Sequence, residues 1–170
     1  MDVSSISRNY RVRSLGLKDV PEVYSLCRSN ELYYSFCPPF VTEESIIKDM
    51  RALPPRKELK DKFYIGFYDD SGLAAVMDLI IAFPNDRTAF IGFFMVDAGR
   101  SNKGVGSGII KELDEFLSNN GFEFIRLGWV KGNPQAEHFW HKNGFKETGV
   151  TYDTDGYTVI VAEKEINPIF

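Results

Sequence analysis

The chain has 170 residues, of which 44% are hydrophobic and 14% aromatic, and this composition excludes a disordered chain. The length predicts one domain, residues 1–170, with a hydrophobic core of its own. The net charge is −4 and no basic block interrupts the sequence, so we expect no nucleic-acid partner.

The spacing of apolar residues and turn residues predicts an alternation of strands and helices. In chain order, the predicted elements are a strand at Tyr10–Arg13, a helix capped by Asp19 and reaching Cys27, a helix capped by Thr42 and reaching about Leu53, strands at Phe63–Tyr68, Ala74–Ala82 and Ala89–Val96, a helix from Val105 that stops at Gly121, a strand at Phe124–Val130, a helix opened by Asn133 and ended by Gly144, and strands at Phe145–Thr151 and Tyr157–Lys164. This order predicts a mixed α/β domain.

Two segments between these elements are predicted to be irregular. Residues 29–41, SNELYYSFCPPFV, are rich in aromatic side chains, and Pro38-Pro39 blocks a helix there. Residues 54–62, PPRKELKDK, read as a charged loop. Ser45 stands where a capping box after Thr42 would place Glu or Gln.

The cysteine content and the first residues bear on the cellular compartment. Cys27 and Cys37 are too few for a disulfide framework, so free thiols in a reducing compartment are expected. The start, MDVSSISRNYRV, lacks the basic and apolar regions of a signal peptide. No apolar run reaches the ~18 residues that span a membrane. We therefore expect a cytoplasmic protein with no membrane partner.

The segment Arg100–Ile110, RSNKGVGSGII, places three glycines ahead of a predicted helix. Such a turn offers free backbone N–H groups at the positive end of the helix dipole, which suits a phosphate. The pattern lacks the GK[ST] of a P-loop, and Ile109 stands where a dinucleotide motif has its third glycine. A loop whose glycines only allow close packing of the helix is the alternative.

Two motifs resemble the GCN5-related N-acetyltransferase (GNAT) family. Val96–Ser107, VDAGRSNKGVGS, resembles the family's acyl-CoA loop, and Asn133–Phe145, NPQAEHFWHKNGF, resembles its second signature N-x-x-A-x-x-F-Y-x-x-x-G-F. The element order also matches over essentially the whole chain. The resemblance implies a GNAT fold, with a mixed, mostly antiparallel sheet of six to seven strands and about four helices.

The resemblance also implies acetyl-CoA as cosubstrate and a wedge between the strand ending at Val96 and the strand from Phe124. The pantetheine arm would lie in this wedge and the pyrophosphate on the glycine loop. The implied cofactor-binding residues are Met95, Val96, Asn102, Lys103, Gly104, Val105, Gly106, Ser107, Asn133 and Trp140. Two positions depart from the family: Ser101 replaces the usual Gln or Arg, and Trp140 replaces a frequent tyrosine.

Asp78 and Trp140 are the candidate catalytic residues. Asp78 interrupts the apolar run AVMDLIIA, so its carboxylate either faces the substrate as a base or pairs within the fold. Trp140 can donate a hydrogen bond but cannot supply a proton to the leaving thiolate. His138 and His141 are expected on the surface, and the aromatic segment Tyr33–Phe40 either lines the acceptor side or covers the sheet. No spacing of His and Cys predicts a metal site.

These observations predict an acetyl-CoA-dependent N-acetyltransferase that transfers the acetyl group directly to a primary amine of a small molecule or peptide. One alternative is an acyl-CoA-binding module with weak or no catalysis, supported by Ser101 and Trp140. A second is a nucleotide-binding domain of another kind. A monomer and a homodimer are both compatible with the sequence.

Overall fold

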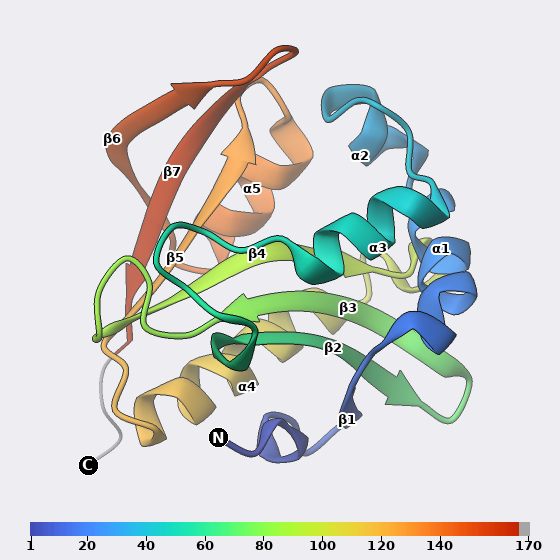
Figure 1. Cartoon of the computed structure of the whole chain (residues 1–170), viewed down its shortest axis with the longest axis horizontal. Helices are drawn as coiled ribbons and strands as arrows, with labels where there is room; N and C mark the ends of the chain where they lie inside the picture. The colour runs from blue at the N-terminus through green and yellow to red at the C-terminus, as the bar shows by residue number, and fades with distance from the viewer. Residues whose placement is uncertain (167–170) are drawn as a thin grey trace.

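A computed structural model describes residues 1–166 of the chain as a single α/β domain built on one seven-stranded sheet (Figure 1). The strands follow the order β1-β2-β3-β4-β5-β7-β6 across the sheet. All neighbours are antiparallel except β4 and β5, which run parallel. The strands are β1 (Arg11–Ser14), β2 (Lys62–Asp69), β3 (Gly72–Ile80), β4 (Thr88–Val96), β5 (Phe124–Val130), β6 (Lys146–Asp153) and β7 (Thr158–Glu165).

Five α-helices lie in the described part of the chain, and short 3₁₀ turns join some of the elements. The helices are α1 (Val20–Arg28), α2 (Glu31–Phe36), α3 (Glu43–Arg51), α4 (Val105–Asn119) and α5 (Pro134–Lys142). The fold class predicted from the sequence is therefore confirmed, with a mixed, mostly antiparallel sheet and four helices longer than α2.

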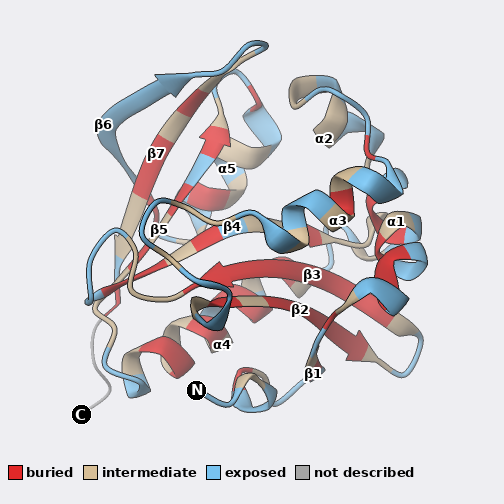
Figure 2. Ribbon diagram, in the orientation of Figure 1, coloured by how far each residue is buried: buried red, intermediate tan, exposed pale blue. Residues whose placement is uncertain are grey.

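Two hydrophobic cores lie on opposite faces of β2–β4, because alternate residues of a strand point to opposite faces. The larger core joins the sheet to α4 and α5, and includes Ile109, Leu113, Trp140 and Phe145. The smaller core joins the sheet to α1 and α3, and includes Val23 of α1, Ile46 of α3 and Tyr64 of β2. β2 and β3 are buried along most of their length, whereas every residue of β6 is exposed (Figure 2).

The aromatic segment expected to be irregular contains α2, so this prediction was wrong for residues 31–36. The two prolines restrict the backbone only from Cys37 onward, since a residue before proline avoids the helical region. Glu31–Phe36 therefore forms a helix that stops at Cys37, whose φ and ψ are −123° and 66°.

Thr42 and Ser45 form a reciprocal capping box in spite of the serine. Thr42 Oγ1 accepts a hydrogen bond from the Ser45 N–H, and the Thr42 N–H donates to Ser45 Oγ, both at 3.0 Å. Cys27 and Cys37 are free thiols, as expected. Within residues 1–166, no helix has the length and apolar character needed to cross a membrane.

Candidate functional site

The parallel strands β4 and β5 pair only near their starts. Their register runs from Thr88 opposite Phe124 to Ile91 opposite Leu127. Beyond these residues β5 turns away with β7 and β6, as Figure 1 shows, while β4 stays with β3. Residues 92–96 of β4 therefore border a wedge between the two halves of the sheet, as the family resemblance implied.

Alternate residues of β4 direct their backbone N–H and C=O groups into this wedge. The Asp97 N–H donates to the Ala74 carbonyl at 2.8 Å, which makes Ala74 and Asp97 a hydrogen-bonded antiparallel pair. Such pairs alternate along a ladder, so the polar backbone groups of Val96 and Phe94 point away from β3 into the wedge. Met95 bonds toward β3 and buries its side chain in the smaller core. Sequence reasoning named Val96 but missed Phe94, because the alternation depends on the register.

The glycine loop connects the end of β4 to α4, with a 3₁₀ turn at Ala98–Arg100. Gly104 precedes the helix at φ +76°, and the first described intrahelical bond runs from the Gly108 N–H to the Gly104 carbonyl. The N–H groups of residues 105–107 are thus free of intrahelical partners. The first turn of α4 carries no acidic side chain. The loop has the properties of an anion site.

The three glycines of the loop serve different needs. Gly104 adopts a left-handed conformation and its Cβ position is open. A Cβ at Gly106 would lie 3.0 Å from the Phe139 ring and 3.4 Å from Val96, so this glycine allows α4 to pack against α5. The Cβ position of Gly108 is also open. The packing alternative therefore explains Gly106 but not Gly104.

Two cations near the loop differ in their freedom. Arg100 forms ion pairs with Asp69 and Asp97, at 2.7 and 2.8 Å, so its guanidinium ties the loop to the β2–β3 turn. These pairs raise the pKa of Arg100, with the Asp69 hydrogen bond as the main cause. Lys103 is exposed and bonds only the Gly99 carbonyl, at 3.1 Å, among the described residues. Lys103 is the cation able to reach a ligand on the loop.

Helix α5 lies beside the loop and carries the second signature. The Asn133 side chain is buried and caps the helix by accepting from the Ala136 N–H at 3.2 Å. Asn143 Nδ2 donates to Ser107 Oγ at 3.1 Å, which joins the end of α5 to the first turn of α4. These contacts give Asn133 and Asn143 positioning roles that need no ligand.

Trp140 is 8% exposed and lies among aromatic rings on the core side of α5. Its ring centroid is 4.8 Å from that of Phe139, 5.1 Å from Phe145 and 6.0 Å from Phe94. Core packing therefore accounts for the size of this side chain. Through Phe94, the cluster also borders the wedge.

Asp78 pairs with Lys62 inside the fold. Lys62 Nζ lies 2.6 Å from Asp78 Oδ2 and also donates to the Ala52 carbonyl at 2.9 Å. The other carboxylate oxygen, Oδ1, is buried without a hydrogen-bond partner among the described residues. Burial raises the pKa of Asp78, and Lys62 opposes this increase. Asp78 thus pairs within the fold through Oδ2, and only Oδ1 is left to accept a further hydrogen bond.

A bulge places Asp78 at the opening of the wedge. Asp78 is opposite Phe93, and the next residue, Leu79, is opposite Ile91, so Gly92 is the extra residue of β4. A Cβ at Gly92 would lie 2.7 Å from Asp78 Oδ2, so only glycine leaves room for the carboxylate. Gly92 is also the first residue of β4 beyond its pairing with β5.

The aromatic segment packs on the side of the sheet that carries Asp78. Tyr33 contacts Phe93 edge to face, with ring centroids 6.1 Å apart. Burial raises the pKa of Tyr33 and the Cys37 side chain adds to this increase, while Cys37 is the main cause of the raised pKa of Tyr157, so the thiol at the end of α2 lies near the turn between β6 and β7. Figure 1 shows α2 facing this turn across the wedge. The segment therefore packs on the sheet through Tyr33 and extends toward the β6–β7 turn.

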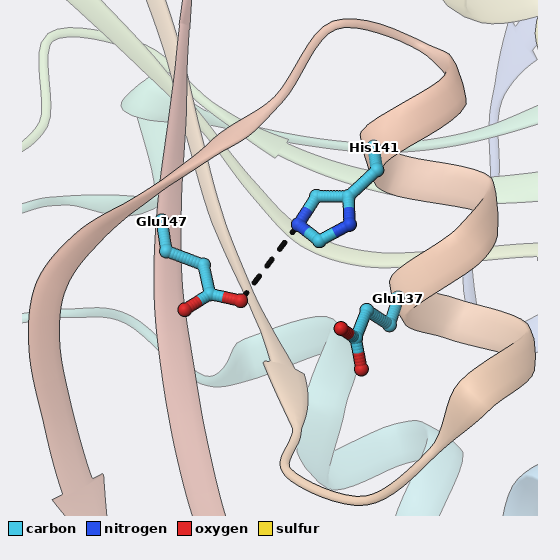
Figure 3. Close-up of side chains that lie close together, drawn as sticks. All are labelled: Glu137, His141 and Glu147. Carbon is cyan, nitrogen blue, oxygen red and sulfur yellow. Dashed lines mark ion pairs between the residues drawn. The ribbon is translucent and has the colours of Figure 1, made fainter.

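His138 and His141 are exposed, as predicted. His141 Nε2 lies 3.7 Å from Glu147 Oε1, and Glu137 points to the same place from one turn earlier in α5 (Figure 3). The three ligand atoms lie within 4.8 Å of one another and could hold a divalent cation. His141 and Glu147 are exposed and Glu137 is half-buried. A surface hollow of about 340 Å³ between the N-terminal segment and α4 includes none of the predicted site residues.

Several solved structures with a similar fold are described as acetyltransferases. An acetyltransferase from Thermus thermophilus matches with a TM-score of 0.72 and 14% identity, over 92% of this chain and 97% of that one. PaiA N-acetyltransferase from Thermoplasma acidophilum, in complex with coenzyme A, matches with 0.65 and 24%, over 92% and 98%. A spermidine N-acetyltransferase SpeG chimera from Vibrio cholerae and hSSAT matches with 0.68 and 18%, over 92% and 95%.

No curated protein sequence matches the chain. At these identities the solved structures establish the fold alone. The family model described as "Acetyltransferase (GNAT) family" matches residues 25–145, a stretch that includes the wedge, the glycine loop and α5. The chain therefore belongs to the acetyltransferase (GNAT) family, whose cosubstrate is acetyl-CoA.

Proposed function

We propose that this protein transfers the acetyl group of acetyl-CoA directly to a primary amine of a small molecule or peptide. The observation that carries the proposal is the wedge between β4 and β5, which ends at a helix N-terminus free of acidic side chains. The wedge suits an extended arm with amide groups, and the helix N-terminus suits a phosphate. Coenzyme A has both parts in this order.

In the proposed complex, the pyrophosphate lies on the N–H groups from Asn102 to Ser107, with Lys103 as a mobile counter-charge. The pantetheine arm pairs with the wedge side of β4. The Val96 carbonyl already accepts a hydrogen bond from Asn30 Nδ2 at 3.2 Å, so we assign the Val96 N–H and the Phe94 backbone to the arm. Asn133 holds the start of α5, and Trp140 supports the wall of the wedge.

The acceptor nitrogen must attack as a free amine. A lysine-like amine has a pKa near 10.4, so only about one molecule in a few thousand is neutral at pH 7. We propose Asp78 as the base, because its carboxylate lies beside Gly92 at the opening of the wedge and its Oδ1 has no hydrogen-bond partner among the described residues. The C–N bond forms, the nitrogen proton passes to the carboxylate directly or through water, and the C–S bond breaks to release the CoA thiolate.

Release of the thiolate needs no strong acid. An alkyl thiol has a pKa of about 8.5, so leaving unprotonated at pH 7 costs on the order of 2 kcal/mol. Trp140 in place of a tyrosine is therefore compatible with catalysis. Together with Ser101, it also favours a second function, an acyl-CoA-binding module with weak or no transfer.

Acceptor-dependent release of free thiol from acetyl-CoA, measured with a panel of primary amines, distinguishes the two functions. Turnover that depends on the amine supports the enzyme. Tight CoA binding without turnover for any amine supports the binding module, and tighter binding of ATP or NAD than of CoA contradicts both. We propose that the protein acts in the cytoplasm as a monomer or homodimer.

A further inference from the structure

Asn30 precedes the helix α2, but its side chain does not cap that helix. Asparagine at this position normally accepts a hydrogen bond from an N–H group of the first helical turn. The Asn30 side chain makes no such bond, and the backbone carbonyl of the residue instead accepts from the Tyr33 N–H at 3.1 Å. The side-chain amide is therefore free to bind elsewhere.

The Asn30 amide reaches the free end of β4. Its Nδ2 donates to the Val96 carbonyl at 3.2 Å and to the Leu26 carbonyl at 3.1 Å. The Val96 carbonyl points away from β3 into the wedge, because Ala74 and Asp97 form the neighbouring hydrogen-bonded pair of the ladder. A group that bonds this carbonyl lies at the edge of the wedge. Asn30 thus brings a side chain from the α1–α2 corner to the strand that borders the wedge.

The two hydrogen bonds also fix the direction in which the amide faces. Exchange of its nitrogen and oxygen would place Oδ1 against two carbonyl oxygens, neither of which can donate. Oδ1 has no hydrogen-bond partner among the described residues, and it is not one of the fully buried atoms that lack a partner there. Because Asn30 is half-buried, an acceptor oxygen stays accessible beside Val96.

We propose that Asn30 binds the pantetheine arm of coenzyme A, with Oδ1 as the acceptor for an amide N–H of the arm. The arm has two amides, and the Val96 N–H is assigned to the carbonyl of one of them. The Val96 carbonyl is engaged by Nδ2, so Asn30 Oδ1 takes its place as the acceptor for the other amide. This inference rests on the proposed function, because it takes the arm to lie in the wedge.

A truncated ligand separates binding of the arm from a general effect on structure. The two ligands are CoA and 3′-phosphoadenosine 5′-diphosphate, which is CoA without the pantetheine arm. Their dissociation constants are measured by calorimetric titration in the wild type and in Asn30→Leu, which keeps a similar size but removes the amide. The matched control is Ser29→Ala, because Ser29 Oγ donates to the same Leu26 carbonyl, at 2.7 Å, and makes no bond to β4.

We expect Asn30→Leu to weaken CoA binding at least about fivefold, the size expected for the loss of one hydrogen bond. Binding of the truncated ligand should change less than twofold, and Ser29→Ala should leave both ligands within twofold of the wild type. Equal losses for the two ligands, or unchanged CoA affinity, overturn the inference and leave the proposed function standing. Failure of the wild type to bind either ligand contradicts both.

Discussion

Arg100 and Asp69 form a two-point ion pair, in which Nε and Nη2 of the arginine lie 2.9 and 2.7 Å from the two carboxylate oxygens. The pair fixes the start of the glycine loop to the turn between β2 and β3. Arg100 is one residue away from the position where the family places a phosphate-binding Gln or Arg. Its side chain therefore holds the loop to the β2–β3 turn, and we expect the loop backbone and Lys103 to bind the phosphate.

Arg100→Gln should weaken CoA binding several-fold and lower the melting temperature, because the loop loses its anchor. The control is Arg87→Gln, which removes an exposed ion pair with Glu123 far from the loop and should change neither quantity. Calorimetric titration with CoA and thermal unfolding check both variants. Equal effects in the two variants would contradict the anchoring role.

The same ion pair predicts a sensitivity to acid. The Arg100 hydrogen bond lowers the pKa of Asp69 in the folded protein. The pair therefore contributes stability above the unfolded pKa of the carboxyl, and the contribution is lost as the pH falls through the folded pKa. Arg100→Gln should lose less stability than the wild type between pH 5 and pH 3, measured by urea unfolding. Parallel losses would contradict this assignment.

Gly104→Ala should weaken CoA binding at least tenfold, because the added Cβ points into the open space where the pyrophosphate is proposed to lie. It should also cost about 1–2 kcal/mol of stability, since alanine is strained at positive φ. Gly121→Ala is the matched control: φ is +85° and its Cβ position is also open, but it follows α4 at the other end. Similar CoA affinities in the two variants would place the pyrophosphate elsewhere.

Asp78 is tested together with its partner. Asp78→Asn alone leaves the buried Lys62 charge unpaired, which typically costs about 3–5 kcal/mol. The double variant Asp78→Asn/Lys62→Met removes both charges and should recover most of that loss. Its CoA affinity should stay within a few-fold of the wild type, whereas its acetyl-transfer rate should fall at least tenfold.

The pH profile distinguishes a base from a structural pair. Because burial raises the pKa of Asp78, the wild-type rate should increase as the pH rises through that pKa and the carboxylate ionises. The double variant should lack this limb of the profile. Profiles of the same shape in both proteins would remove Asp78 from the mechanism.

Trp140 is predicted to serve shape rather than proton transfer. Trp140→Phe keeps an aromatic ring beside Phe139 and Phe145 but removes the N–H, and its transfer rate should stay within a few-fold of the wild type. Trp140→Tyr should gain no more than a few-fold. Trp140→Ala should lose about 3–5 kcal/mol of stability, because it leaves a large cavity. Single-turnover acetyl transfer at saturating acetyl-CoA checks the rates, and a hundredfold gain with tyrosine would mean that proton donation is limiting.

Local signals in the sequence predicted most of the elements. Apolar spacing and capping residues located α1, α3, α4 and α5, and alternation located the seven strands to within a few residues. The helix α2 was not predicted, because Pro38-Pro39 was expected to prevent a helix in the whole segment. These prolines restrict the backbone only from Cys37 onward, so residues 31–36 can form a helix. The glycine loop was also predictable, since the spacing of Gly104, Gly106 and Gly108 ahead of an apolar helix is a local property.

Tertiary structure alone decided how these parts act. The sequence could not tell that Gly106 is required by Phe139, or that Arg100 faces Asp69 rather than a ligand, because each partner is distant in the chain. It also left Asp78 between two roles. The register that places Asp78 beside Gly92, and the position of α3 that brings the Ala52 carbonyl to Lys62, depend on long-range packing, which has no signature in local sequence.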